Sequence, residues 1–540
     1  MTQTRTLILG IPVDDLTMPD TVQRILEMTE NYRQDQTLRA VATINVDFLV
    51  NCLSWSSRSV RYREVVTILR QASLVTADGM PIVWLSTLLG GGLPERVPGS
   101  DLVPQLAQEA AARGKSLYLL GGRVEAAKQA ADYLRDNNPS LRVAGVDSPF
   151  VHTEGEKLGA AVEEDETICS RINAARPDIL LVGFGNPKQE LWIHRNRHRL
   201  EVPVAIGVGG TFHFLAGDVR RAPEWMQRFG MEWVYRLWRE PRRLWRRYCL
   251  GLLKFGFMAG TAVTAYALRR AVSLTARSRP DDSRQGLLFL SAGKSIHVVS
   301  LPPRVNGETL DDLREEADVA LLQDAVVVDF RQVLVLTASA MGFLCELYTR
   351  ARDHGKPFYG MGLRSGVRVL LEANRMWDLL EDCMCADPKG LVARFRERWS
   401  NIDCFFCVRA EQSCKVLGFF GQVDALQLAE VDVKSLISEF IDTHCVVDLS
   451  YCSFIDSTGL SVLVQIFRKL NASGKAFIVC GPRDDTKRAL KLVKLDNLFP
   501  VVDTLPEARR KIAEHEQAGD SVGPSAGEHG GNGAQQDLEV

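Results

Sequence analysis

A strand that ends in a polar, glycine-rich loop constrains the fold of this chain more than any other feature. Residues 179–182 are apolar and predict a buried strand, and residues 183–187, with two glycines and a proline, break it. The amphipathic stretch that follows predicts a helix. Open α/β sheets place their ligands where a strand gives way to a helix in this manner. Lys188, Gln189 and Glu190 stand at this place, and they can meet a phosphate, a sugar hydroxyl and a proton.

Strand and helix patterns alternate from the N-terminus to about residue 220. Six apolar stretches predict strands, at 38–44, 73–76, 116–120, 142–146, 179–182 and 204–208. Amphipathic stretches such as 101–112 and 124–137 lie between them and predict helices. This alternation predicts an α/β fold with a mainly parallel, Rossmann-like sheet covered by helices on both faces.

Polar residues also stand at the ends of other predicted strands. Thr43 and Asn45 end the first strand, and Asp78 follows the second. Arg96 opens the segment 96–102, and the glycine-rich segment 207–212 follows the last strand. Since parallel strands present their carboxyl ends at one edge of a sheet, we expect these residues to lie together.

In this order and spacing, residues of about 5 to 250 resemble the WecG/TagA/CpsF glycosyltransferases, an inverting family that uses nucleotide sugars. The resemblance implies a metal-independent hexosyltransferase that acts in cell-surface or exopolysaccharide synthesis. Its expected donor is a nucleotide sugar, of which a UDP-sugar is favoured. Its expected acceptor is a saccharide linked to a polyprenyl diphosphate.

Glycosyl transfer needs a base that takes a proton from the attacking hydroxyl group. Asp78 suits this role, because it follows an apolar strand and Gly79 lets a substrate approach the backbone closely. The alternative for Asp78 is a cap on the helix predicted to begin near Met80. Arg96 and Lys188 are the candidates that stabilise the departing diphosphate.

The remaining candidates for substrate binding are neutral or weakly charged. Thr43, Asn45 and Gln189 suit sugar hydroxyl groups, and the resemblance places them in the same pocket as Asp78. Glu190 stands beside Gln189. His213 occupies a position where the family usually carries an acidic residue that helps to bind the nucleotide, so the identity of the nucleotide stays open.

Neither a metal nor another cofactor is expected. No pair of acidic residues ends a predicted strand, and the acid clusters at 163–166 and 281–282 lie in polar stretches. The twelve cysteines are scattered, and no secretory signal precedes them, which favours reduced thiols in the cytoplasm. Cys404 and Cys407 could suggest a metal site, but no histidine lies at ligand spacing and the segment resembles a strand.

Residues 220–275 form a basic appendage to the transferase domain, which we place at 1–219. Residues 220–247 contain nine arginines but only three glutamates, with four tryptophans among them. The arginines at helical spacing suit a lipid diphosphate and are Arg236, Arg239, Arg243 and Arg246. Tryptophan suits the headgroup region of a bilayer, and this reading is favoured over nucleic-acid binding.

The apolar stretch 249–268 in this appendage is long enough to span a bilayer, but Lys254 lies inside it. We therefore expect an interfacial helix rather than a spanning one. The predicted location is the cytoplasmic face of the bacterial inner membrane, where the enzyme would be peripheral or monotopic.

Two copies of one α/β domain follow a linker at 276–285. An offset of 119 residues aligns the copy at 286–395 with the copy at 402–516, without a gap from Asp329 to Arg364. The second copy resembles the STAS domain of anti-sigma-factor antagonists, and the first resembles a degenerate one. In that family the residue equivalent to Ser457 is a phosphorylation site at a helix start; the alternative is that Ser457 caps the helix. In the first copy Ala338 takes this place.

The STAS resemblance implies regulation or localisation through a protein kinase, another regulator or a second copy of this chain.

The tail at 517–540 is rich in glycine, serine, alanine, glutamine and acidic residues, and we expect it to be disordered. Two functions follow. The first is a membrane-associated glycosyltransferase, and the alternative is a regulatory scaffold that senses a nucleotide ligand without catalysis.

Overall fold

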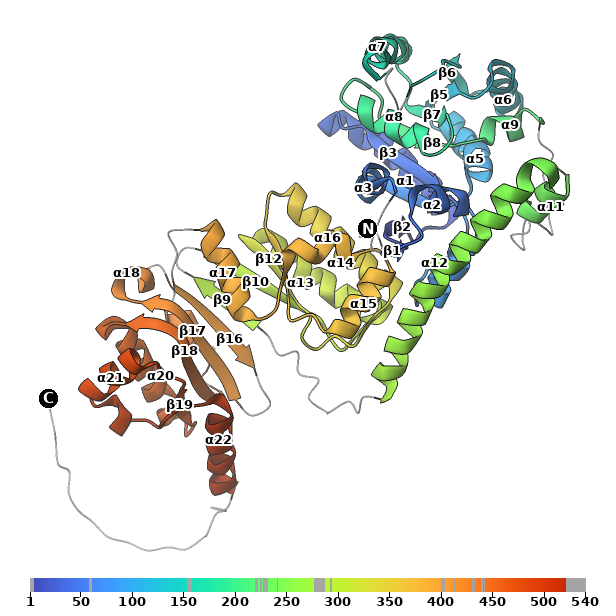
Figure 1. Ribbon diagram of the computed structural model, residues 1–540. Helices are drawn as coiled ribbons and strands as arrows, with labels where there is room; N and C mark the ends of the chain where they lie inside the picture. The colour runs from blue at the N-terminus through green and yellow to red at the C-terminus, as the bar shows by residue number, and fades with distance from the viewer. Residues whose placement is uncertain are drawn as a thin grey trace, which may run out of the picture. The chain divides into compact units, whose positions relative to one another are not determined.

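The chain forms two compact units (Figure 1). The computed structural model describes residues 4–520, except 58–60, 153–157, 219–221, 224–225, 227–231, 240, 276–286, 292–293, 400–403, 411–413, 430, 432, 439 and 441. The first unit contains residues 1–279, 301–322 and 326–384. The second contains residues 280–300, 323–325 and 385–540. The first unit therefore combines the N-terminal half with most of the first repeat.

A six-stranded parallel sheet forms the centre of the N-terminal half, in the order β4-β3-β8-β7-β5-β6. Its strands are β3 (Arg39–Ile44), β4 (Leu74–Ala77), β5 (Ser116–Gly121), β6 (Arg142–Asp147), β7 (Ile179–Gly183) and β8 (Val204–Gly207). All six predicted strands are confirmed, each with its ends shifted by one residue at most.

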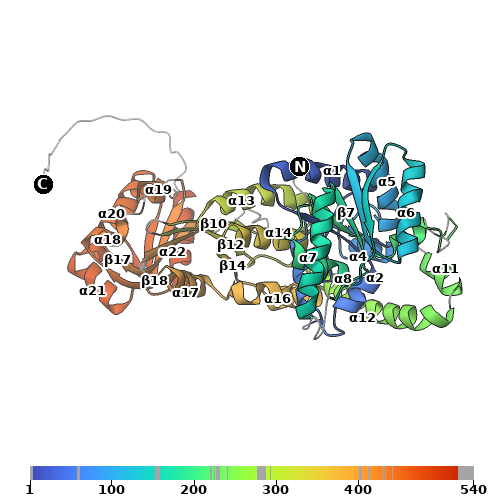
Figure 2. The same ribbon diagram turned by 90° about the horizontal axis from the view of Figure 1, so that it is seen from above.

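Helices cover both faces of this sheet, because alternate residues of each strand point to opposite sides. Leu117 and Leu119 of β5 belong to a core with α1 (Met18–Asp35), α5 (Gly99–Ala112) and α6 (Val124–Asn137). Tyr118 and Leu120 belong to a second core with α7 (Leu158–Ala175) and α8 (Lys188–Asn196). Figure 2 shows α5 and α6 on one side of β7, and α7 and α8 on the other.

A short antiparallel hairpin precedes the sheet, and the sequence patterns did not predict it. Its strands are β1 (Arg5–Ile8) and β2 (Ile11–Asp14), joined by Leu9 and Gly10 with φ of 48° and 89°. The Asp14 carboxylate accepts hydrogen bonds from Arg5 Nε at 2.8 Å and from the Val75 amide at 2.6 Å. The hairpin is thereby tied to β4.

Shorter helices complete the N-terminal half, and a long helix follows them. The short ones are α2 (Val46–Cys52), α3 (Arg63–Gln71), α4 (Met80–Leu88) and α9 (Thr211–Leu215). In the appendage, α11 (Glu232–Arg239) ends before Pro241, which opens α12 (Pro241–Thr275), as the sequence predicts. By length and composition, α12 holds the one described segment that could cross a membrane, Cys249–Thr275.

One face of α12 is buried within the first unit. Lys254 lies on this face, and its Nζ donates to the carbonyl oxygens of Val50 at 2.7 Å and Leu53 at 2.6 Å. The side of α12 that faces solvent exposes apolar side chains, namely Leu250, Leu253, Phe257 and Leu268. Lys254, whose charge led us to expect an interfacial helix, therefore also anchors α12 to α2.

The first repeat lies largely in the first unit. Its elements there are β11 (Arg304–Val305), α13 (Leu310–Leu322), β12 (Ala325–Asp329), β13 (Val335–Leu336), α14 (Ala338–Asp353), β14 (Phe358–Met361), α15 (Ser365–Ala373) and α16 (Trp377–Leu380). β12 pairs with β14 in parallel, and β11 pairs with β13.

The second unit is built on a mixed sheet in the order β10-β9-β16-β17-β18-β19-β20. The strands are β9 (Leu287–Ser291), β10 (Lys294–Ser300), β16 (Cys404–Ala410), β17 (Cys414–Val423), β18 (His444–Ile455), β19 (Phe477–Cys480) and β20 (Val501–Val502). Its helices are α17 (Pro388–Arg398), α18 (Ala425–Leu428), α19 (Val433–Ser438), α20 (Ser457–Ala472), α21 (Asp484–Leu492) and α22 (Leu505–Asp520). α22 ends four residues into the segment expected to be disordered, and residues 521–540 lie outside the described residues.

The two repeats share their local structure at the predicted offset of 119 residues. α14, β14 and α15 of the first copy have the same bounds, after this shift, as α20, β19 and α21 of the second. Arg364 Nε donates to the Arg331 carbonyl at 2.9 Å, and the equivalent Arg483 Nε donates to the Ser450 carbonyl at 3.3 Å. The internal duplication is therefore structural as well as sequential.

Helix α14 of the first repeat packs closely on the β1–β2 hairpin. A Cβ atom on Gly342 would lie 2.1 Å from the Arg5 carbonyl oxygen. The Ala338 amide donates to the Leu89 carbonyl at 2.9 Å, and the hydroxyl groups of Ser339 and Thr6 are 3.2 Å apart. Only glycine permits this approach of a helix to a strand.

Gly342→Ala should therefore lower the free energy of unfolding of the first unit by about 2 kcal/mol, because the backbone of β1 has to move away. Gly260→Ala is the matched control, since it adds a methyl group on α12 where no atom lies within 4 Å, and it should stabilise by about 1 kcal/mol. Eight of the nine tryptophans lie in the first unit, so urea unfolding followed by tryptophan fluorescence is the measurement. Equal stability of both variants would contradict the close contact.

Candidate active site

Four neighbouring parallel strands bring the predicted site residues to one edge of the sheet. β4, β3, β8 and β7 are adjacent, and their carboxyl ends carry Asp78, Asn45, the glycine loop after Gly207, and Gln189 with Glu190. Segments separated by more than 100 residues in sequence thus meet, as expected for a ligand site of an open α/β sheet.

Asp78 and Asn45 form a pair at this edge. The Asp78 amide donates to the Ile44 carbonyl at 2.7 Å, and Asn45 Nδ2 lies 3.4 Å from Asp78 Oδ2. Asp78 is half-buried. The alternative that Asp78 occupies the cap position of α4 is wrong by one residue, because that position is taken by Gly79. The Asp78 carboxylate is in contact with Asn45, the residue that follows β3.

Arg96 lies beside the end of β4. The next residue, Val97, donates its amide hydrogen to the Ala77 carbonyl at 2.7 Å, which fixes the segment next to Asp78. The guanidinium group pairs with Asp101 of α5 at 3.5 Å and lies 4.0 Å from Glu232 of α11. A cation that faces two carboxylates at the mouth of the site can exchange them for phosphate oxygens.

Gln189 and Glu190 are both buried at the start of α8. Gln189 Oε1 accepts from the Gly209 amide at 3.0 Å, and Gln189 Nε2 donates to Glu190 Oε1 at 2.8 Å. Glu190 Oε2 is buried with no hydrogen-bond partner among the described residues. Burial raises the pKa of the Glu190 carboxyl group to about 7, although the hydrogen bond from Gln189 opposes this. Glu190 can therefore hold a proton near neutral pH.

The other predicted substrate-binding residues have different surroundings. The buried Thr43 hydroxyl donates to the Gly207 carbonyl at 3.0 Å and so ties β3 to β8. The Nδ1 atom of His213, on α9, lies 3.0 Å from Oδ2 of Asp218. Lys188 is exposed in the first turn of α8. The structure thus supplies a carboxylate, Asp218, five residues after the position where an acidic residue was expected.

The arginines predicted for a lipid diphosphate lie on α11 and α12. Arg239 is exposed, whereas the side chains of Arg236, Arg243 and Arg246 lie outside the described residues. Among the residues that the structure describes, no group of three or more His, Cys, Asp or Glu residues is placed to hold a metal ion.

Ser457 is the first residue of α20 and is exposed. The residue that caps this helix is Asp456, whose carboxylate accepts from the amides of Gly459 and Ala425, both at 2.9 Å. The alternative that Ser457 is the cap is therefore wrong by one residue. Its hydroxyl group is not required for that structural task.

Two contacts of the site were missed by sequence reasoning. Glu232 reaches Arg96 from the appendage, and Arg375 of the first repeat contacts the loop after α2, as described below. Each residue is remote in sequence from its partner, and no local pattern distinguishes it from other charged residues on a helix.

Comparisons with known proteins agree with this geometry. Residues 6–270 match the glycosyl transferase WecG/TagA/CpsF family, and residues 408–508 match the STAS domain. The N-acetylglucosaminyldiphosphoundecaprenol N-acetyl-beta-D-mannosaminyltransferase of Bacillus subtilis (strain 168) is 30% identical over 237 residues, which cover 42% of this chain and 85% of the relative. The protein of the same name from Staphylococcus aureus (strain MW2) is 31% identical over 243 residues, covering 44% and 86%.

A solved structure, that of an anti-sigma factor antagonist from Mycobacterium paratuberculosis, is 26% identical, and the match covers 20% of this chain and 92% of the other, with a TM-score of 0.18.

The parallel sheet, its polar carboxyl edge and the relatives together define the chain as a glycosyltransferase. The chain belongs to the WecG/TagA/CpsF family through its N-terminal part, and it carries a STAS domain at 408–508.

The raised pKa of Glu190 predicts a dependence of stability on pH. The folded state binds a proton on Glu190 up to about pH 7, whereas an unfolded glutamate loses it near 4.5, so this stabilisation is present below pH 4.5 and is lost as the pH rises through 7. Glu190→Gln should therefore gain about 2 to 3 kcal/mol over the wild type between pH 5 and pH 8.5. Urea unfolding at several pH values measures this difference.

Glu109→Gln, on the exposed side of α5, is the control and should follow the wild type at every pH. A constant difference between Glu190→Gln and the wild type would show that Glu190 is ionised in the folded protein throughout this range.

Proposed function

We propose that this protein transfers a hexosyl group from a nucleotide sugar to a saccharide linked to a polyprenyl diphosphate, with inversion and without a metal ion. A UDP-sugar is the favoured donor. The observation that carries this proposal is the Asn45–Asp78 pair at the carboxyl edge of the sheet, with Arg96 beside it. The names of the two bacterial relatives, which act on a diphosphoundecaprenol-linked sugar, support the acceptor class.

In the proposed reaction Asp78 is the base. Its carboxylate takes the proton from the acceptor hydroxyl group as that oxygen attacks the anomeric carbon. The bond between the anomeric carbon and the nucleoside diphosphate breaks on the opposite side, and the configuration inverts. Asn45 holds the Asp78 carboxylate through the contact of 3.4 Å and keeps it turned toward the edge of the sheet.

The departing diphosphate gains negative charge, which Arg96 and Lys188 stabilise. Arg96 now faces Asp101 and Glu232, and a diphosphate competes with these carboxylates for it. Gln189 and Glu190 bind sugar hydroxyl groups, with Glu190 protonated near neutral pH. Thr43 shapes the pocket by joining β3 to β8, and His213 binds the nucleotide.

The appendage places the enzyme on a membrane surface as a monotopic protein on the cytoplasmic side. The support is that Lys254 fixes α12 to α2, while Leu250, Leu253 and Phe257 remain exposed to solvent. The Trp55 ring lies 5.9 Å from the Phe257 ring and extends this apolar strip. Such a helix lies in the interface plane, and the arginines of 236–246 bind the lipid diphosphate.

The STAS domain at 408–508 serves regulation or localisation in this proposal. Exposure of Ser457 at a helix start supports its phosphorylation by a protein kinase, since the helix N-terminus favours negative charge. The first repeat is a degenerate STAS domain, which the shared bounds of three elements support. Phosphopeptide mapping from native cells tests the modification of Ser457.

The alternative function is a scaffold that only senses a nucleotide.

Asp78→Asn should lower turnover by about two to four orders of magnitude, because the amide cannot take the acceptor proton. Binding of the nucleotide should survive, since the amide keeps the size and the contact with Asn45. Asp132→Asn on the exposed face of α6 is the control. Radiolabelled sugar transfer and calorimetry with UDP give the two quantities, and turnover near that of the wild type would remove Asp78 from the base role.

Replacing Leu253 and Phe257 together by serine should weaken binding to phospholipid vesicles about tenfold or more, because two apolar side chains no longer enter the interface. Leu322→Ser is the control, since Leu322 is even more exposed than Leu253 and Phe257 but lies on α13. Sedimentation with vesicles that contain phosphatidylglycerol measures the partition. Unchanged sedimentation of the double variant would exclude this strip as the membrane face.

A further inference from the structure

Carbonyl groups at the end of α2 and in the loop that follows it receive hydrogen bonds from two cations that are distant in sequence. Lys254 of α12 donates to Val50 and Leu53, as described above. Arg375, just beyond α15 in the first repeat, donates from Nη2 to the Ser54 carbonyl at 2.5 Å and from Nη1 to the Ser56 carbonyl at 2.9 Å. Positive charge at a helix C-terminus also interacts favourably with the helix dipole.

Arg375 is built into this position rather than lying on the surface. Its residue is 3% exposed, and its backbone takes the left-handed conformation with φ of 57°, where glycine is the usual residue. Burial lowers the pKa of the guanidinium group to about 10, and the charge of Asp378 opposes the shift. A buried arginine that donates to two backbone carbonyls fixes the segment that carries them.

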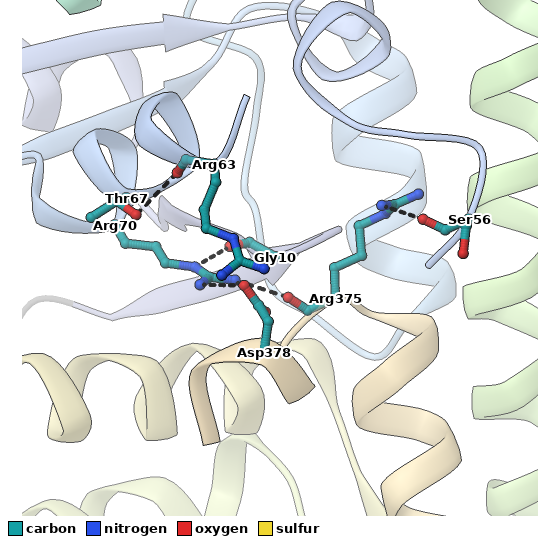
Figure 3. A network of polar contacts seen from close by, with 7 residues as sticks. All are labelled: Gly10, Ser56, Arg63, Thr67, Arg70, Arg375 and Asp378. Carbon is teal, nitrogen blue, oxygen red and sulfur yellow. Dashed lines mark hydrogen bonds and ion pairs between the residues drawn. The ribbon is translucent and has the colours of Figure 1, made fainter. Parts of the chain in front are cut away.

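Arg70 of α3 completes the contact, as Figure 3 shows. Its Nη1 and Nη2 donate to the two oxygens of Asp378 at 3.2 Å each, and Nη2 also donates to the Arg375 carbonyl at 2.8 Å. Its Nε donates to the Gly10 carbonyl in the hairpin turn at 2.9 Å. The first repeat therefore holds the hairpin, α3 and the loop after α2 through one network.

Helix α2 connects this network to the active site. The helix has seven residues, and the residue that caps its N-terminus is Asn45, whose Oδ1 accepts from the Phe48 amide at 3.0 Å. The Nδ2 atom of the same side chain contacts Asp78. A displacement of the C-terminal end of so short a helix moves Asn45 as well, because hydrogen-bonded helical turns shift together.

The second repeat leaves exposed the face that the first repeat uses for these contacts. The positions equivalent to Ala338, Gly342 and Arg375 are Ser457, Ser461 and Lys494, and all three are exposed. In the first repeat the small residues permit contact with β1 and α4, and Arg375 enters the transferase domain. The first copy thus binds the transferase domain with the face that the second copy leaves exposed.

We propose that the first repeat is an activating part of the transferase site, and that Arg375 is its positioning residue, which holds α2 so that Asn45 meets Asp78. This inference rests on the proposed function, because the activity it supports is sugar transfer with Asp78 as the base. The first repeat then acts on catalysis through fixed contacts, whereas the second repeat faces outside partners.

The test uses the full chain with Arg375→Gly, because glycine tolerates the left-handed backbone and the change removes only the side chain. We expect kcat to fall about 10- to 100-fold, while KM for the nucleotide sugar stays within about twofold, as for a misplaced catalytic group. Guanidinium chloride at tens of millimolar should restore part of kcat in this variant. The matched control is Arg368→Ala on α15. Arg368 is exposed and its guanidinium group pairs with Glu372 of the same helix, so this variant should keep the kcat of the wild type.

Hydrogen exchange at the amides of 46–57 supplies a readout that is independent of activity, and exchange there should be faster in Arg375→Gly than in Arg368→Ala. Faster exchange together with an inactive wild type would refute the proposed function and still support the hold of Arg375 on α2. Wild-type kcat in Arg375→Gly would overturn the positioning role. A loss of kcat that guanidinium does not restore, with unchanged exchange at 46–57, would overturn it as well.

Discussion

Carbonyl groups at the end of α2 and in the loop that follows it need hydrogen-bond donors, and the structure of the first unit depends on how these donors are supplied. Lys254 and Arg375 reach this point from the appendage and from the first repeat. Because buried backbone groups are costly to leave unpaired, neither segment can separate from the transferase domain without a loss of stability. The catalytic domain, the long helix and the first repeat therefore form one folding unit, with Asn45 at the opposite end of α2.

Most of the sheet could be predicted from the sequence because its strands are buried runs of apolar residues with clear ends. The β1–β2 hairpin could not, since Pro12 within the second strand argues against a strand. Local reasoning placed Asp78, Asn45 and Gln189 at strand ends, and the parallel order of the strands then brought them together. The role of Arg375 depends on docking between distant segments, which no local pattern encodes.

The two repeats show how duplicated domains of one fold acquire different tasks. Three of their elements, namely α14, β14 and α15, keep the same bounds as α20, β19 and α21, and side chains on one face differ between the copies. A glycine at 342 and an alanine at 338 allow backbone contact in the first copy, whereas serines occupy both places in the second. Compared with the second copy, the first copy thus lacks a hydroxyl group at Ala338 and a Cβ atom at Gly342. This face is buried in the first copy and exposed in the second.

Transfer of labelled sugar by the purified full chain tests the central claim most directly. The chain is incubated with a panel of radiolabelled nucleotide sugars and a polyprenyl-diphosphate-linked saccharide, and the anomeric configuration of the lipid product is determined by NMR. The account predicts that label enters the lipid fraction with an inverted configuration and that chelation of divalent metals leaves the rate unchanged. Binding of nucleotide without transfer from any donor would contradict it and favour a ligand-sensing scaffold.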